Sequence, residues 1–380
     1  MTAVIDASAL PAQAIPVPPK ADASDIRFVT LDLMRGGAAL VVAIAHFIGV
    51  MPAHLAVDFF LVLSGFILAH RYLYGRPVGF RSFLAARIAR LYPLHLLTLL
   101  LFAFVYLVRF RSLPDYADGT GWTFVANLLL LQNVGLTGSE LTWNAPSWSI
   151  SVEFWINVLF FACITRRTPR WLLLAVSAGA LAVLATFERS LAVSLPNYFG
   201  FLNAGMLRGL CSFLLGVVAF RIHAQRAGAA GVINPVPEVV RFLVLVLSTA
   251  LIIVPRPGLE RLDFIAPLVF SACVVLYAVD SQRWRAVVLP LSHLGTISYS
   301  IYLLHYPILY GIRYLKELAV GLRAEGVWVD LVFDPVGSFM FYLALVLGLS
   351  HLCFKWFERP SRSLVRRWLD RPRPQVFPIG

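Results

Sequence analysis

The chain has 380 residues, of which 59% are hydrophobic and only 14% are charged, and its mean hydropathy is +0.78. Soluble domains carry about 25% charged residues, so this composition excludes a soluble globular domain and indicates an integral membrane protein. The formal net charge of +12 raises the question of nucleic-acid binding. The basic residues are instead scattered in short segments between apolar runs, which is typical of membrane topology, so no nucleic-acid partner is expected.

The N-terminal residues 1–25 are rich in Ala and Pro and lack the basic stretch and apolar core of a signal peptide. We expect them to form a disordered cytoplasmic tail. Residues 26–362 are expected to form a single transmembrane domain without internal repeats. Residues 363–380 are expected to form a basic cytoplasmic tail.

Eleven apolar segments follow the tail in chain order. Ten can span a bilayer, at about 32–50, 56–72, 91–110, 147–165, 170–187, 199–221, 239–255, 264–280, 290–312 and 336–357. The segment at 122–134 is shorter than the roughly 20 residues that a spanning helix needs. The sequence therefore predicts an all-α integral membrane protein, a bundle of about ten transmembrane helices plus one short re-entrant or interfacial segment.

The distribution of Lys and Arg supports ten spans with both termini in the cytoplasm. This topology places most of the 32 basic residues on the cytoplasmic side, as the positive-inside rule requires. If residues 122–134 formed a full span, the basic loops at 71–90 and 166–170 would lie on opposite sides of the membrane.

Arg35 and His46 stand eleven residues apart in the first apolar segment. On a helix this spacing returns to within about 20° of the starting direction, so both side chains share one face, about 16 Å apart along the axis. Ionisable groups in membrane spans usually face the bundle interior or a wet cavity. Alternatively, Arg35 extends to the membrane surface and His46 only packs, but their alignment favours a functional role.

Three more titratable residues are expected at the depth of His46. They are Asp58 at the start of the second span, Glu153 in the fourth and His305 in the ninth. Two imidazoles and two carboxylates at one level could form a general acid/base site. The alternatives are a helix N-cap for Asp58 and a contact between two helices for Glu153.

Polar and aromatic residues next to these groups are candidates for binding substrate. Ser298, Tyr302 and His305 share one helical face, Tyr299 is adjacent to Ser298, and Trp148 precedes Glu153 by five residues. Hydrogen bonds between helices or aromatic side chains at the membrane interface are the alternative.

Arg87 and Arg90 precede the third span at a spacing that puts both guanidinium groups on one helical face. Guanidinium groups match the geometry of phosphate, so the pair is a candidate site for a phosphorylated substrate. Ordinary positive-inside anchoring is the alternative.

Several other kinds of site are excluded. The four cysteines, Cys163, Cys211, Cys273 and Cys353, are far apart and show no metal-ligand spacing, so no metal site is expected. The chain contains no phosphate-binding P-loop, no HExxH zinc motif and no GxSxG nucleophile motif.

Six motifs in order along the chain resemble those of the acyltransferase 3 family of multi-pass membrane acyltransferases. They are LDLMRG at 31–36 with His46 following, VDFFLVLSGF at 57–66, RIAR at 87–90, WSISVE at 148–153, SYSIYLLHYP at 298–307 and FERP at 357–360. Together they cover about residues 27–362.

The resemblance implies transfer of an acyl group, usually acetyl, from cytoplasmic acyl-CoA to a hydroxyl of an envelope glycan or its lipid-linked precursor. The donor is then a substrate, and no permanently bound cofactor is expected. The family's functional positions map to Arg35, His46, Arg87 and Arg90, with the three arginines at the donor. The chain is expected in the bacterial inner membrane, in contact with its lipids.

Several alternatives remain open at this point. The acceptor could be a small cytoplasmic molecule, or the protein could be a secondary transporter, although the missing repeat argues against transport. Many relatives carry a fused extracytoplasmic hydrolase-like domain that is not expected here, so direct transfer, a covalent intermediate and handover to a separate protein all remain open. A homo-oligomer or a polysaccharide-export partner is also open.

Overall fold

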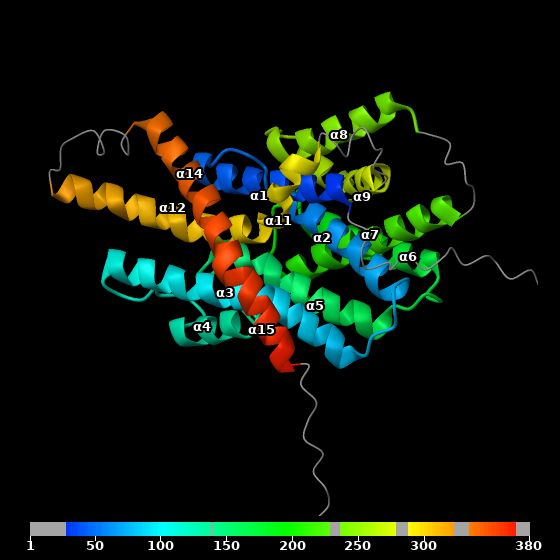
Figure 1. The fold of residues 1–380 in the computed structure, drawn as a ribbon, viewed down its shortest axis with the longest axis horizontal. Helices are drawn as coiled ribbons and strands as arrows, with labels where there is room; N and C mark the ends of the chain where they lie inside the picture. Colours follow the sequence, from blue (N-terminus) through cyan, green and yellow to red (C-terminus); the bar gives the residue numbers. More distant parts are fainter. Residues whose placement is uncertain (1–27, 138–139, 229–235, 279–287, 323–333, 370–380) are drawn as a thin grey trace, which may run out of the picture.

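The computed structural model describes residues 28–137, 140–228, 236–278, 288–322 and 334–369 (Figure 1). The predicted disordered tail at 1–25 lies outside these residues. Every predicted apolar segment contains a helix. The α-helices are α1 (Val29–Ile48), α2 (Leu55–Leu68), α3 (Phe80–Phe110), α4 (Thr120–Leu128), α5 (Trp148–Cys163), α6 (Arg170–Phe187), α7 (Ala204–Gly228), α8 (Glu238–Ile253), α9 (Ala266–Tyr277), α11 (His293–Thr296), α12 (Ser298–Gly321), α14 (Pro335–Cys353) and α15 (Arg359–Leu369).

Shorter elements connect or extend these helices. The 3₁₀ helices are η2 (Ala145–Ser147), η3 (Glu260–Ile265) and η4 (Leu289–Ser292), and the π-helical turns are η1 (Ala69–Leu73) and η5 (Phe354–Glu358). One antiparallel hairpin, β1 (Asn197–Tyr198) with β2 (Leu202–Asn203), pairs Asn197 with Asn203. The sequence did not predict this hairpin. The predicted tail boundary at residue 362 falls inside α15.

Among the described residues, six helices are long and apolar enough to cross a membrane. They are α1, α2 with η1, α3, α6, α7, and the continuous helix from α14 to α15. The other predicted spans are shorter or more polar: α5, α8 and α9 have at most 16 residues, and α12 carries Arg313 and Lys316. The short predicted segment at 122–134 contains the nine-residue α4, while the count of ten spans stays a prediction.

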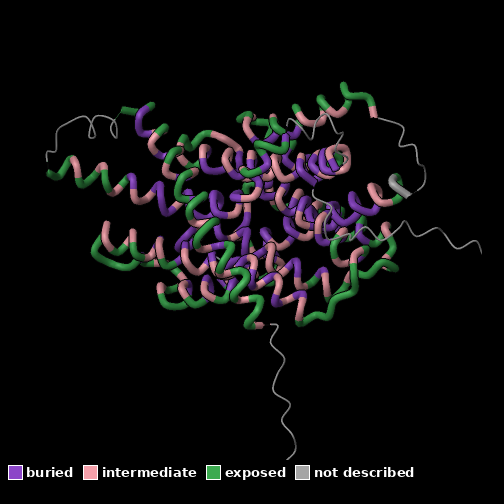
Figure 2. Tube along the Cα trace, viewed as in Figure 1, coloured by how far each residue is buried: buried purple, intermediate pink, exposed green. Residues whose placement is uncertain are grey.

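The outer helices present apolar side chains to their surroundings. Trp171 and Leu172 on α6, Phe242 and Leu243 on α8, and Met340 on α14 are all exposed. Figure 2 shows buried residues gathered in the middle of the bundle and exposed ones along its outer helices. An extended apolar surface on helices, whose backbone groups are already hydrogen-bonded, is suited to contact with lipid.

Helices α2 and α7 form the centre of the bundle and pack closely on each other. Two glycines allow this contact. A Cβ added to Gly65 would meet the backbone carbonyl of Phe213, and one added to Gly216 would meet the carbonyl of Val62. Small residues allow helix backbones to approach closely in membranes, so this contact fixes α2 for the site described below.

We expect the substitution Gly65→Ala to lower the free energy of unfolding by about 1–3 kcal/mol, because the new methyl group forces α2 and α7 apart. The control is Gly179→Ala on α6, where nothing lies within 4 Å of an added Cβ. Alanine is the better helix former, so the control should be neutral or slightly stabilising. Thermal unfolding in detergent measures both, and equal midpoints would show that the α2–α7 contact is not tight.

Candidate active site

One cavity of about 410 Å³ lies among α1, α2, α3, α5, α11, α12, η5 and α15. We call it the arginine cavity, after its three basic residues Arg35, Arg90 and Arg362. Three acidic residues also line it: Asp32, Glu153 and Glu358. The rest of the lining includes apolar side chains of α2 and the predicted substrate residues Ser298, Tyr299 and Tyr302.

Arg35 is held in place by contacts with three residues. Its Nε donates to Ser298 Oγ at 3.1 Å, its Nη2 donates to the carbonyl of Gly295 at 2.8 Å, and the same Nη2 lies 3.0 Å from Asp32 Oδ1. The backbones of α1 and α11 touch here, since a Cβ on Gly36 would meet the backbone of Leu294. This close packing fixes the Arg35 guanidinium at the cavity wall.

The two arginines of the RIAR motif have different surroundings. Arg90 is half-buried and lines the cavity, where it forms no hydrogen bond or ion pair with another described residue. Arg87 does not line the cavity. It is only 3% exposed, its guanidinium lies 5.7 Å from the Tyr72 ring centroid, and its Nη2 donates to the Tyr72 hydroxyl at 3.4 Å. The predicted donor role of the pair therefore fits Arg90 better than Arg87.

Glu153 and Tyr299 are also fixed by neighbours in the arginine cavity. Ser64 donates a hydrogen bond of 3.2 Å to Glu153 Oε1, which links α2 to α5. The Tyr299 hydroxyl donates to the carbonyl of Leu91 at 2.6 Å, which links α12 to α3. Glu153 thus lies in the cavity that contains Arg35, not beside His46 as the sequence suggested.

A second cavity of about 410 Å³ lies at the other end of α1. We call it the histidine cavity because His46 and His54 line it. Its other polar and aromatic lining residues include Trp148, Ser194 and Arg208. Of the predicted substrate residues, Trp148 faces this cavity, and its ring centroid lies 5.3 Å from the Arg208 guanidinium carbon.

His46 is exposed to the histidine cavity and has a defined tautomer. Its Nδ1 lies 2.9 Å from the carbonyl oxygen of Val42. A carbonyl only accepts hydrogen bonds, so we assign the ring proton to Nδ1. The neutral ring then has a lone pair on Nε2, which is the state that a general base requires.

The structure brings the two predicted imidazoles together. The ring centroids of His46 and His305 lie 4.9 Å apart. His305 is fully buried, its Nδ1 lies 3.3 Å from the carbonyl of Ile301, and its Nε2 has no partner among the described residues. His305 therefore packs behind His46 and is shielded from the cavity.

The two cavities share two lining residues, Val57 and Tyr302. The Tyr302 hydroxyl lies 2.8 Å from Ser149 Oγ and donates to the carbonyl of Pro146 at 3.0 Å. The Phe60 ring packs edge-on against Tyr302 at a centroid distance of 5.7 Å. Val57 and Tyr302 thus belong to the wall between the cavities, and Tyr302 is held in it by hydrogen bonds.

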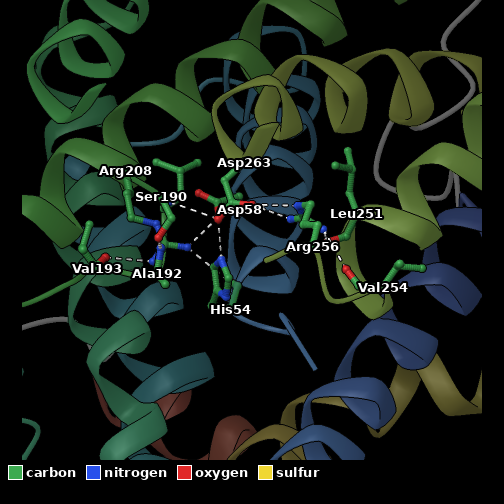
Figure 3. Close-up of polar contacts among 11 residues, drawn as sticks. His54, Asp58, Ser190, Ala192, Val193, Arg208, Leu251, Val254, Arg256 and Asp263 are labelled. Carbon is green, nitrogen blue, oxygen red and sulfur yellow. Dashed lines mark hydrogen bonds and ion pairs between the residues drawn. The ribbon is translucent and has the colours of Figure 1, made fainter. Parts of the chain in front are cut away.

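Asp58 lies outside the predicted acid/base cluster (Figure 3). It is fully buried and forms an ion pair with Arg208, whose Nη2 donates a 2.6 Å hydrogen bond to Asp58 Oδ2. Its Oδ1 accepts a 3.1 Å hydrogen bond from Ser212. The prediction that Asp58 shares one site with His46, Glu153 and His305 is therefore corrected. Sequence position gave its depth along α2 but not the direction in which its side chain points.

Arg208 connects this ion pair to the walls of the histidine cavity. Its Nη2 also donates to the carbonyl of His54 at 3.1 Å, and its Nη1 donates to that of Val193 at 2.9 Å. Arg208 is not among the site residues that the sequence predicted. A charged residue inside the apolar run 199–221 was the available signal that it has a structural or functional partner.

A second acidic residue, Asp263 in η3, fixes the other side of His54 (Figure 3). Its carboxylate lies 2.8 Å from His54 Nε2 and accepts two bonds from Arg256, at 3.2 and 2.5 Å. Burial raises the pKa of Asp263, but the bonds from His54 and Arg256 lower it by more, so this pKa lies below its ordinary value. Asp263 therefore remains ionised at neutral pH.

We expect Asp58→Asn to lower the free energy of unfolding by roughly 3–5 kcal/mol, because it leaves Arg208 buried without its counter-charge. Glu238→Gln is the control. Glu238 is 69% exposed and pairs with Arg241 at 3.0 Å, and exposed pairs contribute about 0–1 kcal/mol. If Asp58→Asn kept full stability and lost only turnover, Asp58 would be a catalytic residue after all.

In the part of the chain that the structure describes, no group of three or more His, Cys, Asp or Glu side chains could hold a metal ion.

Comparisons with known proteins give three relatives. A Rhizobium radiobacter protein named protein 2 in the picA locus is 38% identical over 182 residues, which cover 42% of this chain and 95% of that protein. The Komagataeibacter xylinus protein BcsY, named as a membrane-bound transacylase, is 26% identical over 355 residues, 89% of this chain and 83% of its own length. The Streptomyces mycarofaciens acyltransferase MdmB is 29% identical over 182 residues, 42% of this chain and 46% of its own length.

No solved structure matches the chain. A family model described as an acyltransferase domain matches residues 28–355, which include nearly all residues that line the two cavities. The chain therefore belongs to the acyltransferase 3 family and is a membrane acyltransferase.

Proposed function

We propose that the protein transfers an acyl group, expected to be acetyl, from acyl-CoA in the arginine cavity to a hydroxyl group of a glycan in the histidine cavity. One observation carries this proposal: among the described residues, Val57 and Tyr302 alone line both cavities, and α1 contributes Arg35 to the first cavity and His46 to the second. Donor and acceptor can then approach the same wall from opposite ends of the bundle.

The arginine cavity offers acyl-CoA two kinds of surface, arginines for its phosphates and apolar side chains for its acyl end. Arg90 lines it and has no hydrogen-bond or ion-pair partner among the described residues, and arginine forks pair with phosphate oxygens. Beyond the arginines the lining includes Phe60, Leu61 and Ile150, which suit the apolar end of a thioester. The basic residues near this cavity favour a cytoplasmic opening under the positive-inside rule.

The histidine cavity is suited to a hydroxyl acceptor. His46 Nε2 is the available base, and Trp148 and Tyr302 offer aromatic surface next to it. The glycan as acceptor rests on the resemblance of the sequence motifs to those of the family. The relative named as a membrane-bound transacylase supports acyl transfer in a membrane setting.

The proposed reaction begins when Tyr302 moves from the wall, so that the thioester carbonyl meets the acceptor hydroxyl near His46. His46 Nε2 takes the hydroxyl proton as the oxygen attacks the carbonyl carbon. The tetrahedral intermediate then expels the CoA thiolate, which receives the proton from His46. This movement breaks the hydrogen bonds that Tyr302 forms with Ser149 and Pro146, so the released hydroxyl groups of Tyr302 and Ser149 can donate to the developing oxyanion.

We expect His46→Gln to lower the rate of acyl transfer by about 10²–10⁴-fold, the usual cost of losing a general base, with the affinity for acetyl-CoA unchanged. The comparison variant is His305→Gln, which should give a smaller defect because His305 is shielded from the cavity. Transfer of radiolabelled acetyl groups and calorimetric binding of acetyl-CoA, measured on the same preparations, separate the two effects. Turnover of His46→Gln within a few-fold of the unmodified protein would place the base elsewhere.

We expect Arg90→Gln to weaken acetyl-CoA binding roughly 10–100-fold, because a charged hydrogen bond to phosphate is lost. Arg87→Gln is the matched variant on the same helix. Since Arg87 packs against Tyr72 and does not line the cavity, its removal should change thermal stability more than donor affinity. Equal loss of affinity in both variants would mean that the whole RIAR motif contacts the donor.

A further inference from the structure

Arg362 lines the arginine cavity from α15, at the C-terminal end of the described chain. The family match ends at residue 355, so α15 lies beyond it. Arg362 is not among the site residues that the sequence predicted. The structure instead places it in the same cavity as Arg35 and Arg90.

A π-helical turn explains why Arg362 faces the cavity. Helices α14 and α15 form one long helix joined by η5, which Figure 1 shows as a continuous element coloured from orange to red. Each π-turn adds one residue relative to an α-helix, so it rotates the following residues by about 100° around the helix axis. Such turns are frequent at functional sites. Here the turn is followed directly by the helix that carries Arg362.

Glu358 anchors α15 in this orientation. It is 7% exposed and accepts a 2.6 Å hydrogen bond from Ser300 on α12, while α15 packs along α3. Arg362 follows Glu358 by four residues, one helical turn further out on the same face. The buried carboxylate therefore determines where the Arg362 guanidinium lies.

Arg362 has charge available for a ligand. It forms no hydrogen bond or ion pair with another described residue, and the charges that act on it come mainly from Arg90, Glu358, Arg71 and Arg366. Of these, the single carboxylate is already bonded to Ser300. Arg90 and Arg362 both line the arginine cavity, so two guanidinium groups without a hydrogen-bond or ion-pair partner among the described residues are available there to a multiply charged anion.

The exposure of the arginines indicates which part of the donor reaches Arg362. Arg35 and Arg90 are half-buried, whereas Arg362 is exposed at the cavity mouth. The proposed reaction requires the thioester at the wall formed by Val57 and Tyr302, so the nucleotide of acyl-CoA must lie towards the mouth. Resting on the proposed function, we infer that Arg362 binds the phosphate on the ribose of the donor nucleotide, the phosphate group farthest from the thioester.

The test compares acetyl-CoA with acetyl-dephospho-CoA, which lacks only the ribose phosphate, on the full-length protein in detergent. The unmodified protein should bind acetyl-CoA about tenfold more tightly than acetyl-dephospho-CoA. Arg362→Gln should lose this preference by weakening acetyl-CoA binding about tenfold, with binding of the dephospho form unchanged. Arg362→Lys should retain part of the preference, because the positive charge remains.

Arg359→Gln is the matched control, since Arg359 is exposed on the same helix and does not line the cavity. Its preference for acetyl-CoA should equal that of the unmodified protein. Equal weakening of both donors by Arg362→Gln, or an unchanged preference, would overturn the inference alone. If the unmodified protein binds neither donor, the proposed function itself fails.

Discussion

Asp58 and Arg208 form an ion pair inside an apolar bundle, and the walls of both cavities depend on it. Two buried charges are stable in such surroundings only when nearly all of their hydrogen-bonding groups have partners. Ser212 and the carbonyls of His54 and Val193 supply those partners. These contacts fix α2 against α7, and Val57, next to Asp58 in sequence, is held in the wall between the cavities.

Helix α1 sets the distance between the two halves of the site. Arg35 and His46 are separated by about 16 Å along one rigid helix, so neither can move towards the other. Each is also held locally, Arg35 by Ser298 and Gly295, and His46 by the carbonyl of Val42. In the proposed reaction, donor and acceptor must therefore meet through their own reach into the bundle and through the wall residues, and not through movement of Arg35 or His46.

Periodicity and apolar run length predicted much of this architecture. The eleven apolar segments each contain a helix, and the shared face of Arg35 and His46 follows from helical spacing. What the sequence could not give is the rotation of each helix about its axis. Asp58 and Glu153 were predicted at the depth of His46. Asp58 instead faces Arg208, 150 residues away in sequence, and Glu153 faces Ser64 in the arginine cavity. The position of Arg362 in the arginine cavity depends on the π-helical turn η5, and no sequence pattern predicted that turn.

The wall formed by Val57 and Tyr302 also bears on the permeability of the membrane. Two cavities that approach each other from the two ends of a bundle bring water close to the middle of the bilayer, where an ion would otherwise meet the full hydrocarbon barrier. Val57 and Tyr302 lie between the cavities at this point, and the hydrogen bond between Tyr302 and Ser149 holds Tyr302 in place. If substrates enter from both ends, as proposed, the protein must admit them without conducting protons, and the packing of Phe60 against Tyr302 would then help to keep this place closed to ions.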